Sequence, residues 1–434
     1  MKIRFFHARI LTMEEGRDIF EGEVWVEDSR IIYVGTGKDT DEVFKRTGKN
    51  CIIWDEEIDC QGNLLMPGFK NAHTHSGMTF LRSYADDLPL DEWLHEKIFP
   101  AEGKLRKDDI YENIRLAVLE YLTSGITSIF DMYIEPEPIA KACQDMGMRC
   151  VQASGLNNFT QSLELLEKDY LKLNKKDSLI SFRLGFHAEY TCSKELLEGL
   201  ASLAHKYKAP VYAHMCETVK EVEECKARYD VTPTEFLDSL GMFDYGGGGY
   251  HCVYMSEKDL KIFEEKGLSV ITNPASNLKL ASGIAPIQEF LNRNINVAIG
   301  TDGPASNNCL DMFREMFLVT GLAKVREKDA AVVDAMEVLK MATVNGAKAM
   351  GLLDCDVLSE GKKADIIMLD LNMPNMQPLN HIAKNIVYSG SKQNVKMTMI
   401  NGKILYKDGK FYTDCEPGQI YEKVNSIIQR ITAE

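Results

Sequence analysis

The sequence contains no apolar run that approaches the length of about 18 residues that a membrane span needs. Charged residues interrupt the segment from Met1 to Arg9, which argues against the apolar core of a secretory signal peptide. Basic residues are in deficit, since 65 acidic against 50 basic residues give a formal net charge of −15. Because duplex DNA and anionic membranes bind clustered Lys and Arg, we expect a cytoplasmic protein that binds neither nucleic acid nor membrane.

Closely spaced cysteine pairs are also missing. The eleven cysteines are scattered, odd in number and never arranged as C-x-x-C, which argues against a disulfide framework and a structural zinc knuckle. The combination of H-x-E with P-C-x-x-C that marks the zinc site of cytidine deaminases is absent as well. We therefore expect reduced thiols, most of them buried.

What is present is a repeated alternation of β-rich runs and helical periods between residues 64 and 303. The chain of 434 residues, with 45% hydrophobic and 26% charged residues, suits one α/β barrel plus a small second domain. Eight such runs predict a (β/α)₈ TIM barrel rather than an open sheet. The predicted strands are 64–72, 127–131, 149–153, 180–186, 210–213, 249–253, 269–272 and 296–300.

The two chain ends have a different pattern. Short alternating runs at 22–26 and 31–34 are matched late in the chain by runs at 364–369 and 396–400, with turn dipeptides at 401–402 and 408–409. We predict a small β-sandwich domain made of residues 1–63 plus 356–434, flanking a barrel of residues 64–355. Residues 419–434 are expected to form a helix, and the glycine run 246–249 is expected to be a flexible turn.

Polar residues stand at the predicted strand ends, where barrel enzymes carry their catalytic groups. Five of the nine histidines are among them. The full set is His73, His75, Asp131, Ser154, His187, His214 with Glu217, His251, Asn273 and Asp302. We expect these side chains to share one face of the barrel.

His73 and His75 are two residues apart in a strand, so both imidazoles point to the same side and can reach one metal ion. Together with His214 and Asp302 they would hold a divalent transition metal and leave a position open for water, whose pKa the ion lowers. Two-metal barrels usually need a lysine or carboxylate ligand from the fourth strand, and residues 181–187 contain no lysine. We expect one ion per chain, zinc before iron or manganese.

The remaining strand-end residues suggest proton transfer. Asp302 can accept the proton of the water, and His251 can hydrogen-bond the same water or a developing oxyanion. A buried Glu217 with a raised pKa can protonate a ring nitrogen, and His187 can orient the ring. In the alternative interpretation His187 and His251 are core histidines, Glu217 caps the helix that begins near residue 218, and Asp131 is structural.

Several motifs resemble the amidohydrolase superfamily, namely residues 66–68 before His73-Thr74-His75, residues 300–303 and residues 360–366. Segments 81–94, 100–102, 273–280 and 302–308 are similar to the 5-methylthioadenosine/S-adenosylhomocysteine deaminases. This resemblance implies a homo-oligomeric enzyme that acts on a small-molecule substrate and replaces an adenine amino group by oxygen, releasing ammonia. It implies zinc ligation by His73, His75, His214 and Asp302, purine binding by His187 and Glu217, and ribose binding by Glu102.

The departures from that family lie around the substrate. Ser154 stands where an arginine able to pair with a substrate carboxylate is frequent. Glu189 and Tyr254 also differ from the residues common in the family. These differences favour methylthioadenosine, adenosine or 5′-deoxyadenosine over S-adenosylhomocysteine. The alternatives are a deaminase or dechlorinase of guanine, a pterin or an s-triazine, a two-metal cyclic amide hydrolase, and a non-catalytic metal-binding scaffold.

Overall fold

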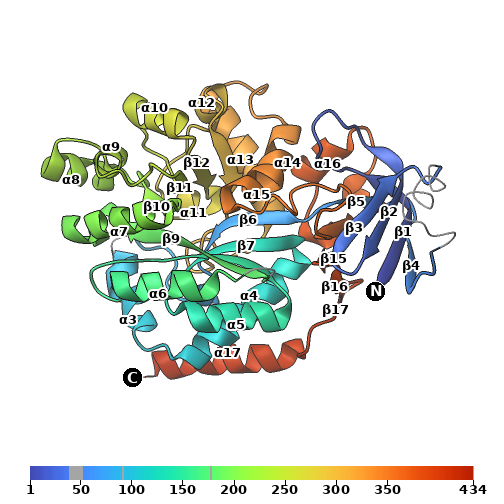
Figure 1. The fold of residues 1–434 in the computed structure, drawn as a ribbon, viewed down its shortest axis with the longest axis horizontal. Helices are drawn as coiled ribbons and strands as arrows, with labels where there is room; N and C mark the ends of the chain where they lie inside the picture. The colour runs from blue at the N-terminus through green and yellow to red at the C-terminus, as the bar shows by residue number, and fades with distance from the viewer. Residues whose placement is uncertain (39–51, 90–91, 176–177, 434) are drawn as a thin grey trace.

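A computed structural model describes residues 1–38, 52–89, 92–175 and 178–433. Eight parallel strands are hydrogen-bonded in chain order into the predicted barrel (Figure 1). They are β6 (Phe69–Thr74), β7 (Ile126–Met132), β8 (Arg149–Ala153), β9 (Ile180–Ala188), β10 (Val211–Met215), β11 (Gly247–His251), β12 (Ser269–Thr272) and β13 (Asn296–Ile299).

Helices follow the strands and surround the barrel. Serine or threonine side chains that accept a hydrogen bond from the first turn begin several of them, including Ser162, Ser193, Thr218, Thr232 and Ser256. The main helices are α4 (Lys107–Thr123), α5 (Pro136–Met146), α6 (Leu163–Leu173), α7 (Lys194–Tyr207), α8 (Val219–Tyr229), α9 (Pro233–Ser239), α10 (Glu257–Lys266), α11 (Pro274–Lys279), α12 (Ile287–Asn292), α13 (Met312–Glu327), α14 (Ala335–Ala342) and α15 (Val344–Met350). Within the described ranges, no helix combines the length and the apolar character needed to cross a bilayer.

Short helical segments occupy the loops. Those on the barrel are η1 (Ser76–Leu81), η2 (Trp93–Ile98), α3 (Phe99–Glu102) and η3 (Glu189–Thr191), and those near the C-terminus are η4 (Pro374–Met376), α16 (Ile382–Tyr388) and η5 (Lys392–Asn394). The predicted C-terminal helix is present as α17 (Pro417–Thr432). It packs on α4 of the barrel, where Lys423 Nζ donates to Glu112 at 2.6 Å.

The strands of both chain ends form a separate nine-stranded sheet, seen at the right of Figure 1. Its strands are β1 (Lys2–Ile10), β2 (Phe20–Glu27), β3 (Arg30–Gly35), β4 (Glu56–Asp59), β5 (Leu64–Pro67), β14 (Ile366–Leu369), β15 (Val395–Ile400), β16 (Lys403–Lys407) and β17 (Lys410–Phe411). The order is β17-β16-β15-β14-β5-β1-β2-β3, and β4 pairs with β1. Both predicted turn dipeptides join hairpins and have positive φ angles, 52° and 77° at Asn401-Gly402 and 49° and 79° at Asp408-Gly409.

The predicted first barrel strand, 64–72, is wrong as a single element. Residues Leu64–Pro67 form β5 of the nine-stranded sheet, and the barrel strand β6 begins at Phe69. The break falls at Gly68, where a Cβ atom would lie 2.0 Å from the side chain of Thr127 on β7. Pro67 and Gly68 therefore let the chain leave one sheet and enter the next in a space that only glycine fits.

The prediction of a flexible turn at residues 246–249 is also wrong, because β11 begins at Gly247. A Cβ atom would lie 1.9 Å from the Val211 carbonyl oxygen at Gly247 and 2.3 Å from the Ser269 carbonyl oxygen at Gly248. These glycines allow the neighbouring strands to approach closely. Glycine here serves packing inside a strand.

A buried ion cluster joins the barrel to the sheet of the chain ends. Arg149 at the start of β8 donates two hydrogen bonds to Asp365, at 2.7 and 2.9 Å, and Lys70 Nζ lies 4.0 Å from the same carboxylate. The side chains of Lys70 and Asp365 are fully buried. Asp365 also accepts from the backbone N–H of Asn401, and its carbonyl oxygen accepts from Gly68. One carboxylate thus connects β8, β6 and the late hairpin.

We predict that Asp365→Ala lowers the free energy of unfolding by about 3–5 kcal/mol, because it leaves two buried cations without a counter-charge. Denaturant unfolding followed by circular dichroism measures this change. Lys141→Ala is the matched control, since Lys141 and Asp145 form an exposed pair within one helix, and such pairs contribute little. Equal stability of the two variants would contradict a structural role for the buried cluster.

Candidate metal and active site

The barrel closes where β13 meets β6. The backbone N–H of Asp302 donates to the carbonyl oxygen of His73 at 3.0 Å. The side chain of Asn71 exchanges two hydrogen bonds with Thr301, at 2.7 and 2.9 Å. Gly300 permits this approach, because a Cβ atom there would lie 2.7 Å from the Cβ of His73. The seam therefore brings His73 and Asp302 together from opposite ends of the barrel sequence.

Four histidines and one aspartate converge beside this seam. Ligand atoms of His73, His214, His251 and Asp302 all lie within 4.8 Å of one another. His75 joins them, with its Nε2 3.2 Å from Asp302 Oδ1 and 3.3 Å from His214 Nε2. His73 Nε2 lies 3.4 Å from Asp302 Oδ1.

These separations fit a metal site. Donors about 2.0–2.1 Å from a tetrahedral zinc ion are about 3.3 Å apart, and the three separations within His73, His75, His214 and Asp302 have that size. The ring nitrogens of His73 are buried, and neither has a hydrogen-bond partner among the residues that the structure describes. A bond to a cation would satisfy Nε2, so the donor set suits a divalent metal.

Second hydrogen bonds orient the histidines. The Nδ1 of His75 bonds the carbonyl oxygen of Met132, and the Nδ1 of His214 bonds the carbonyl oxygen of His187 at 2.7 Å. His251 Nδ1 bonds Asn277 Oδ1 at 2.7 Å. In each case the partner on Nδ1 leaves Nε2 directed to the site.

Two serine side chains, Ser276 on α11 and Ser306 on the loop after β13, hold Asp302 in one orientation. Its Oδ1 faces His73 and His75, while its Oδ2 accepts from Ser276 Oγ at 2.5 Å and from Ser306 Oγ at 2.8 Å. Its backbone is left-handed, with φ at 59°, which turns the carboxylate inward from the strand end. Although burial opposes ionisation, the bonds to the two histidines hold the pKa of Asp302 well below its usual range.

Burial divides the histidines into neutral and charged groups in the metal-free protein. It lowers the pKa of His73 to about 3 and that of His187 to about 4, and it lowers the pKa of His214 well below the usual value. For His75 the opposing effect of burial is outweighed by the hydrogen bond and charge of Asp302, which raise its pKa to about 9. One ligand proton must therefore leave when a cation binds at neutral pH.

Glu217 points back toward the site from the turn after β10. Cys216 has a left-handed backbone with φ at 52°, and the carboxylate of Glu221 accepts from the N–H groups of Cys216 at 2.7 Å and Glu217 at 2.8 Å. The carboxylate of Glu217 accepts from Ser282 Oγ at 3.1 Å and lies 3.8 Å from His251 Nε2. The residue that caps α8 is Thr218, so the interpretation of Glu217 as a helix cap is wrong.

Glu102 and His187 lie at the edges of the site. Glu102 ends α3, and burial raises the pKa of its carboxyl to about 7. His187 Nδ1 lies 3.3 Å from Thr191 Oγ1, in contact with the ring of His214. Asp131, interpreted from the sequence as structural, accepts from the N–H of Ser76 at 3.0 Å.

The loop that leads to Glu102 is fastened to two other loops. Lys279 Nζ, at the end of α11, donates to Asp86 Oδ1 at 2.6 Å and to the carbonyl oxygen of Ala305 at 2.9 Å. The other oxygen of Asp86 accepts from Asn308 at 3.0 Å. The segments after β6, β12 and β13 thus form one connected rim.

The structure places the three departures from the family outside the metal cluster. The hydroxyl of Ser154 donates to Gln161 Oε1 at 2.8 Å and accepts from the N–H of Leu156 at 3.2 Å. Glu189 is buried and accepts from Arg228 Nη2 at 2.5 Å. Tyr254 is partly exposed, and its hydroxyl packs against Gly283, where a Cβ atom would lie 2.9 Å away. Gly283 follows Ser282, the residue that donates to Glu217.

Sequence reasoning missed the residues that hold the predicted ones, namely Ser276, Asn277, Ser282, Ser306 and Glu221. Two of them, Ser276 and Asn277, lie in a segment singled out for its resemblance, and Ser306 lies in another. The sequence pattern does not indicate which atom each of these hydroxyl, amide or carboxylate groups contacts. Such contacts join different loops and become visible only in the folded barrel.

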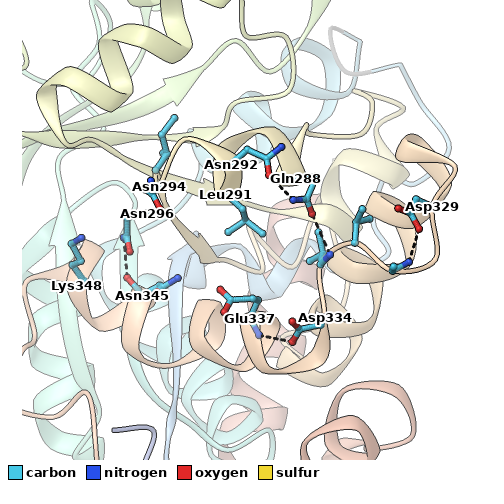
Figure 2. A pocket seen from close by; sticks show the side chains of 14 residues that line it. Gln288, Leu291, Asn292, Asn294, Asn296, Asp329, Asp334, Glu337, Asn345 and Lys348 are labelled. Carbon is cyan, nitrogen blue, oxygen red and sulfur yellow. Dashed lines mark hydrogen bonds between the residues drawn. The ribbon is translucent and has the colours of Figure 1, made fainter. Parts of the chain in front are cut away.

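A cavity of about 640 Å³ lies elsewhere, at the amino end of β13 (Figure 2). Polar side chains of α12, α14 and α15 line it, but they bond to one another: Gln288 donates to Asn292 at 2.8 Å and Asn296 donates to the carbonyl oxygen of Asn345 at 3.2 Å. Asp302 follows the opposite, carboxyl end of the same strand. The cavity is therefore separate from the histidine cluster.

Known proteins that resemble this one match it over nearly the whole chain. The Amidohydrolase family pattern matches residues 64–405. The chain is 40% identical over 422 residues to a 5-methylthioadenosine/S-adenosylhomocysteine deaminase of Desulforamulus reducens, covering 96% of both chains. It is 38% identical over 399 residues to a 5′-deoxyadenosine deaminase of Methanothermobacter thermautotrophicus, covering 90% of this chain and 91% of the relative.

Among solved structures, the fold is similar to that of an adenosine deaminase from Xanthomonas campestris with bound zinc. The TM-score is 0.92 with 30% sequence identity, and the match covers 99% of this chain and 98% of the other.

The raised pKa of His75 predicts that metal binding releases protons. At pH 7 the metal-free protein carries a proton on His75, whose pKa is about 9, while His73 and His214 are already neutral. Apparent metal affinity should therefore rise with pH up to about pH 9.

Titration calorimetry of the metal-free protein with Zn²⁺, in buffers of different ionisation enthalpy, measures the protons released. We expect at least one proton per ion at pH 7, and a decrease of about one between pH 7 and pH 10. Equal proton release at the two pH values would contradict protonation of His75 in the metal-free site.

Proposed function

Since the chain belongs to the amidohydrolase family and is a metal-dependent hydrolytic deaminase of adenosine-type nucleosides, we propose that its substrate carries no charged group at the 5′ position. The observation that carries this proposal is the environment of Ser154. Where relatives place a cation, this chain has a small hydroxyl whose hydrogen bonds stay inside its own loop. A 5′ carboxylate would lose its water there without gaining a charged partner.

The neighbouring charges support the same substrate class. Arg228 is engaged by Glu189 on the loop after β9. Lys279 is engaged by Asp86, and Arg82 by Glu120. Each of these three cations already has a carboxylate within hydrogen-bonding distance. Methylthioadenosine, 5′-deoxyadenosine and adenosine need no such cation.

We assign the metal to His73, His75, His214 and Asp302, and we propose a single zinc ion. A bound ion supplies a Lewis acid that lowers the pKa of a water molecule to near neutrality. β9 offers no lysine for a second, bridged ion. His251 is the fourth histidine of the cluster, and its Nε2 lies 3.8 Å from Glu217, so we propose that it hydrogen-bonds the attacking water or the developing oxyanion.

Proton transfer is assigned to two carboxylates. Glu217, fixed by Ser282 and by the turn that Glu221 holds, protonates the ring nitrogen next to the amino-bearing carbon as water adds. Asp302 accepts one proton of the attacking water and passes it to the amino group, which leaves as ammonia. Glu217 takes the second proton from the adduct hydroxyl as the C=O bond forms, which restores its carboxyl group. Ser276 and Ser306 keep one oxygen of Asp302 occupied, so the oxygen facing the histidines is the one that acts.

Two further residues position the nucleoside. His187, whose lowered pKa of about 4 keeps it neutral, can hydrogen-bond the purine edge beside His214. Glu102 can accept from the ribose hydroxyls, since one of its oxygens is buried with no partner among the described residues. In this proposal Glu102 contacts the ribose, His187 the purine ring, and the metal cluster the carbon that carries the amino group.

Glu217→Gln should keep its metal and lose at least about a hundredfold in kcat, because the amide holds the hydrogen bond from Ser282 but delivers no proton. His73→Ala should lose the metal and the activity together. Metal analysis and ammonia release on both variants separate the two roles. Full turnover by Glu217→Gln would remove Glu217 from the mechanism, and a fully metallated, active His73→Ala would refute the ligand set.

Ammonia release from a panel of heterocycles tests the proposed substrate class. The panel comprises methylthioadenosine, 5′-deoxyadenosine, adenosine, S-adenosylhomocysteine, guanine and cytosine, with protein of known metal content. We expect the three nucleosides with uncharged 5′ groups to have higher kcat/KM than S-adenosylhomocysteine, and guanine and cytosine to be inert.

Ser154→Arg is the matched variant for the panel, because it supplies the missing cation at the same place. It should raise kcat/KM for S-adenosylhomocysteine relative to kcat/KM for methylthioadenosine. A wild-type preference for S-adenosylhomocysteine would contradict the proposal.

A further inference from the structure

Two buried polar groups near the histidine cluster interact with one another. The hydroxyl of Tyr133 and the Oε1 atom of Glu102 are both buried, and neither bonds to any other group within the described parts of the chain. Tyr133 as a whole is 6% exposed. A tyrosine hydroxyl and a carboxylate can each form more than one hydrogen bond, so a buried pair with no partner but each other keeps hydrogen-bonding capacity for a ligand.

The position of Tyr133 is fixed by the core of the site. It follows β7 directly, and its ring packs on Gly77, where a Cβ atom would lie 2.2 Å from the ring. The residue before it, Met132, supplies the carbonyl oxygen that orients His75. The position of Tyr133 is thus coupled to that of His75, a proposed metal ligand, through the peptide unit between Met132 and Tyr133.

The phenol stays protonated over the range in which the enzyme can work. Burial, reinforced by the nearby charge of Glu102, raises the pKa of Tyr133 well above its usual value. It can therefore donate a hydrogen bond as well as accept one, whereas an ionised carboxylate only accepts.

We propose that Tyr133 and Glu102 together form the receptor for the vicinal diol of the ribose, with Tyr133 as a substrate-binding residue. One ribose hydroxyl donates to Glu102 and the other accepts from Tyr133. This inference rests on the proposed function, since it adds a second group to the recognition of an adenosine-type nucleoside. It explains why a tyrosine hydroxyl is buried beside a carboxylate, and why residue 77 is glycine.

The test compares nucleosides that differ only in the diol. Tyr133→Phe removes the hydroxyl and keeps the ring against Gly77. We expect KM for adenosine to rise about five- to tenfold, the size of one lost hydrogen bond, and KM for 2′,3′-dideoxyadenosine to stay unchanged. Tyr111→Phe is the matched control, because its hydroxyl donates to Asp145 on the barrel exterior at 2.7 Å.

Equilibrium binding of inosine and 2′,3′-dideoxyinosine, the unreactive products, decides the inference independently of turnover. Tyr133→Phe should raise the Kd for inosine about five- to tenfold and leave the Kd for the dideoxy compound unchanged. Equal weakening of both compounds would assign Tyr133 to packing and overturn the inference, as would no weakening of either. Wild-type protein that binds inosine but releases no ammonia from any nucleoside would refute the proposed function and leave the diol receptor standing.

Discussion

The closure of the barrel between β6 and β13 is the constraint on which the site depends. The hydrogen bond from Asp302 to the carbonyl oxygen of His73 joins the first and last strands at their carboxyl ends. Asn71 and Thr301 reinforce the same seam, and Gly300 lets it close. Because both partners carry side chains of the proposed metal site, the interaction that closes the barrel also brings these side chains together.

Around the seam, the residues proposed to react are few, and the residues that hold them in position are many. Each inward-facing histidine nitrogen has its opposite nitrogen or its backbone fixed by a carbonyl or amide from another strand end. Serine hydroxyls fix the carboxylates of Asp302 and Glu217. Left-handed backbone at Cys216, His251 and Asp302 turns the chain sharply as it leaves three strands. Such conformations persist only where surrounding contacts enforce them, which preorganises the groups for their roles.

The sequence was sufficient for the barrel and for the convergence of its histidines, because hydrophobic runs with polar ends report strand limits directly. It was insufficient where two explanations share one pattern. The apolar run 64–72 looked like one strand, since nothing local distinguishes a change of sheet at Gly68 from a continuous strand. Glycines 247–249 suggested flexibility, although their cause is contact with strands distant in sequence. Ser154 and Glu189 stood out as departures, but their partners could not be inferred, because Gln161 is brought back by the fold of the same loop and Arg228 comes from α8.

The sheet built from both chain ends has a consequence for how the molecule is made. β5 lies between β1, from the beginning of the chain, and β14, which is synthesised only after the whole barrel. Until β14 arrives, β5 presents an open edge of unpaired N–H and C=O groups, and such an edge pairs readily with a strand from another chain. Residues 366–369 thus cover a strand edge that residues 64–67 leave open until the barrel between them has been synthesised.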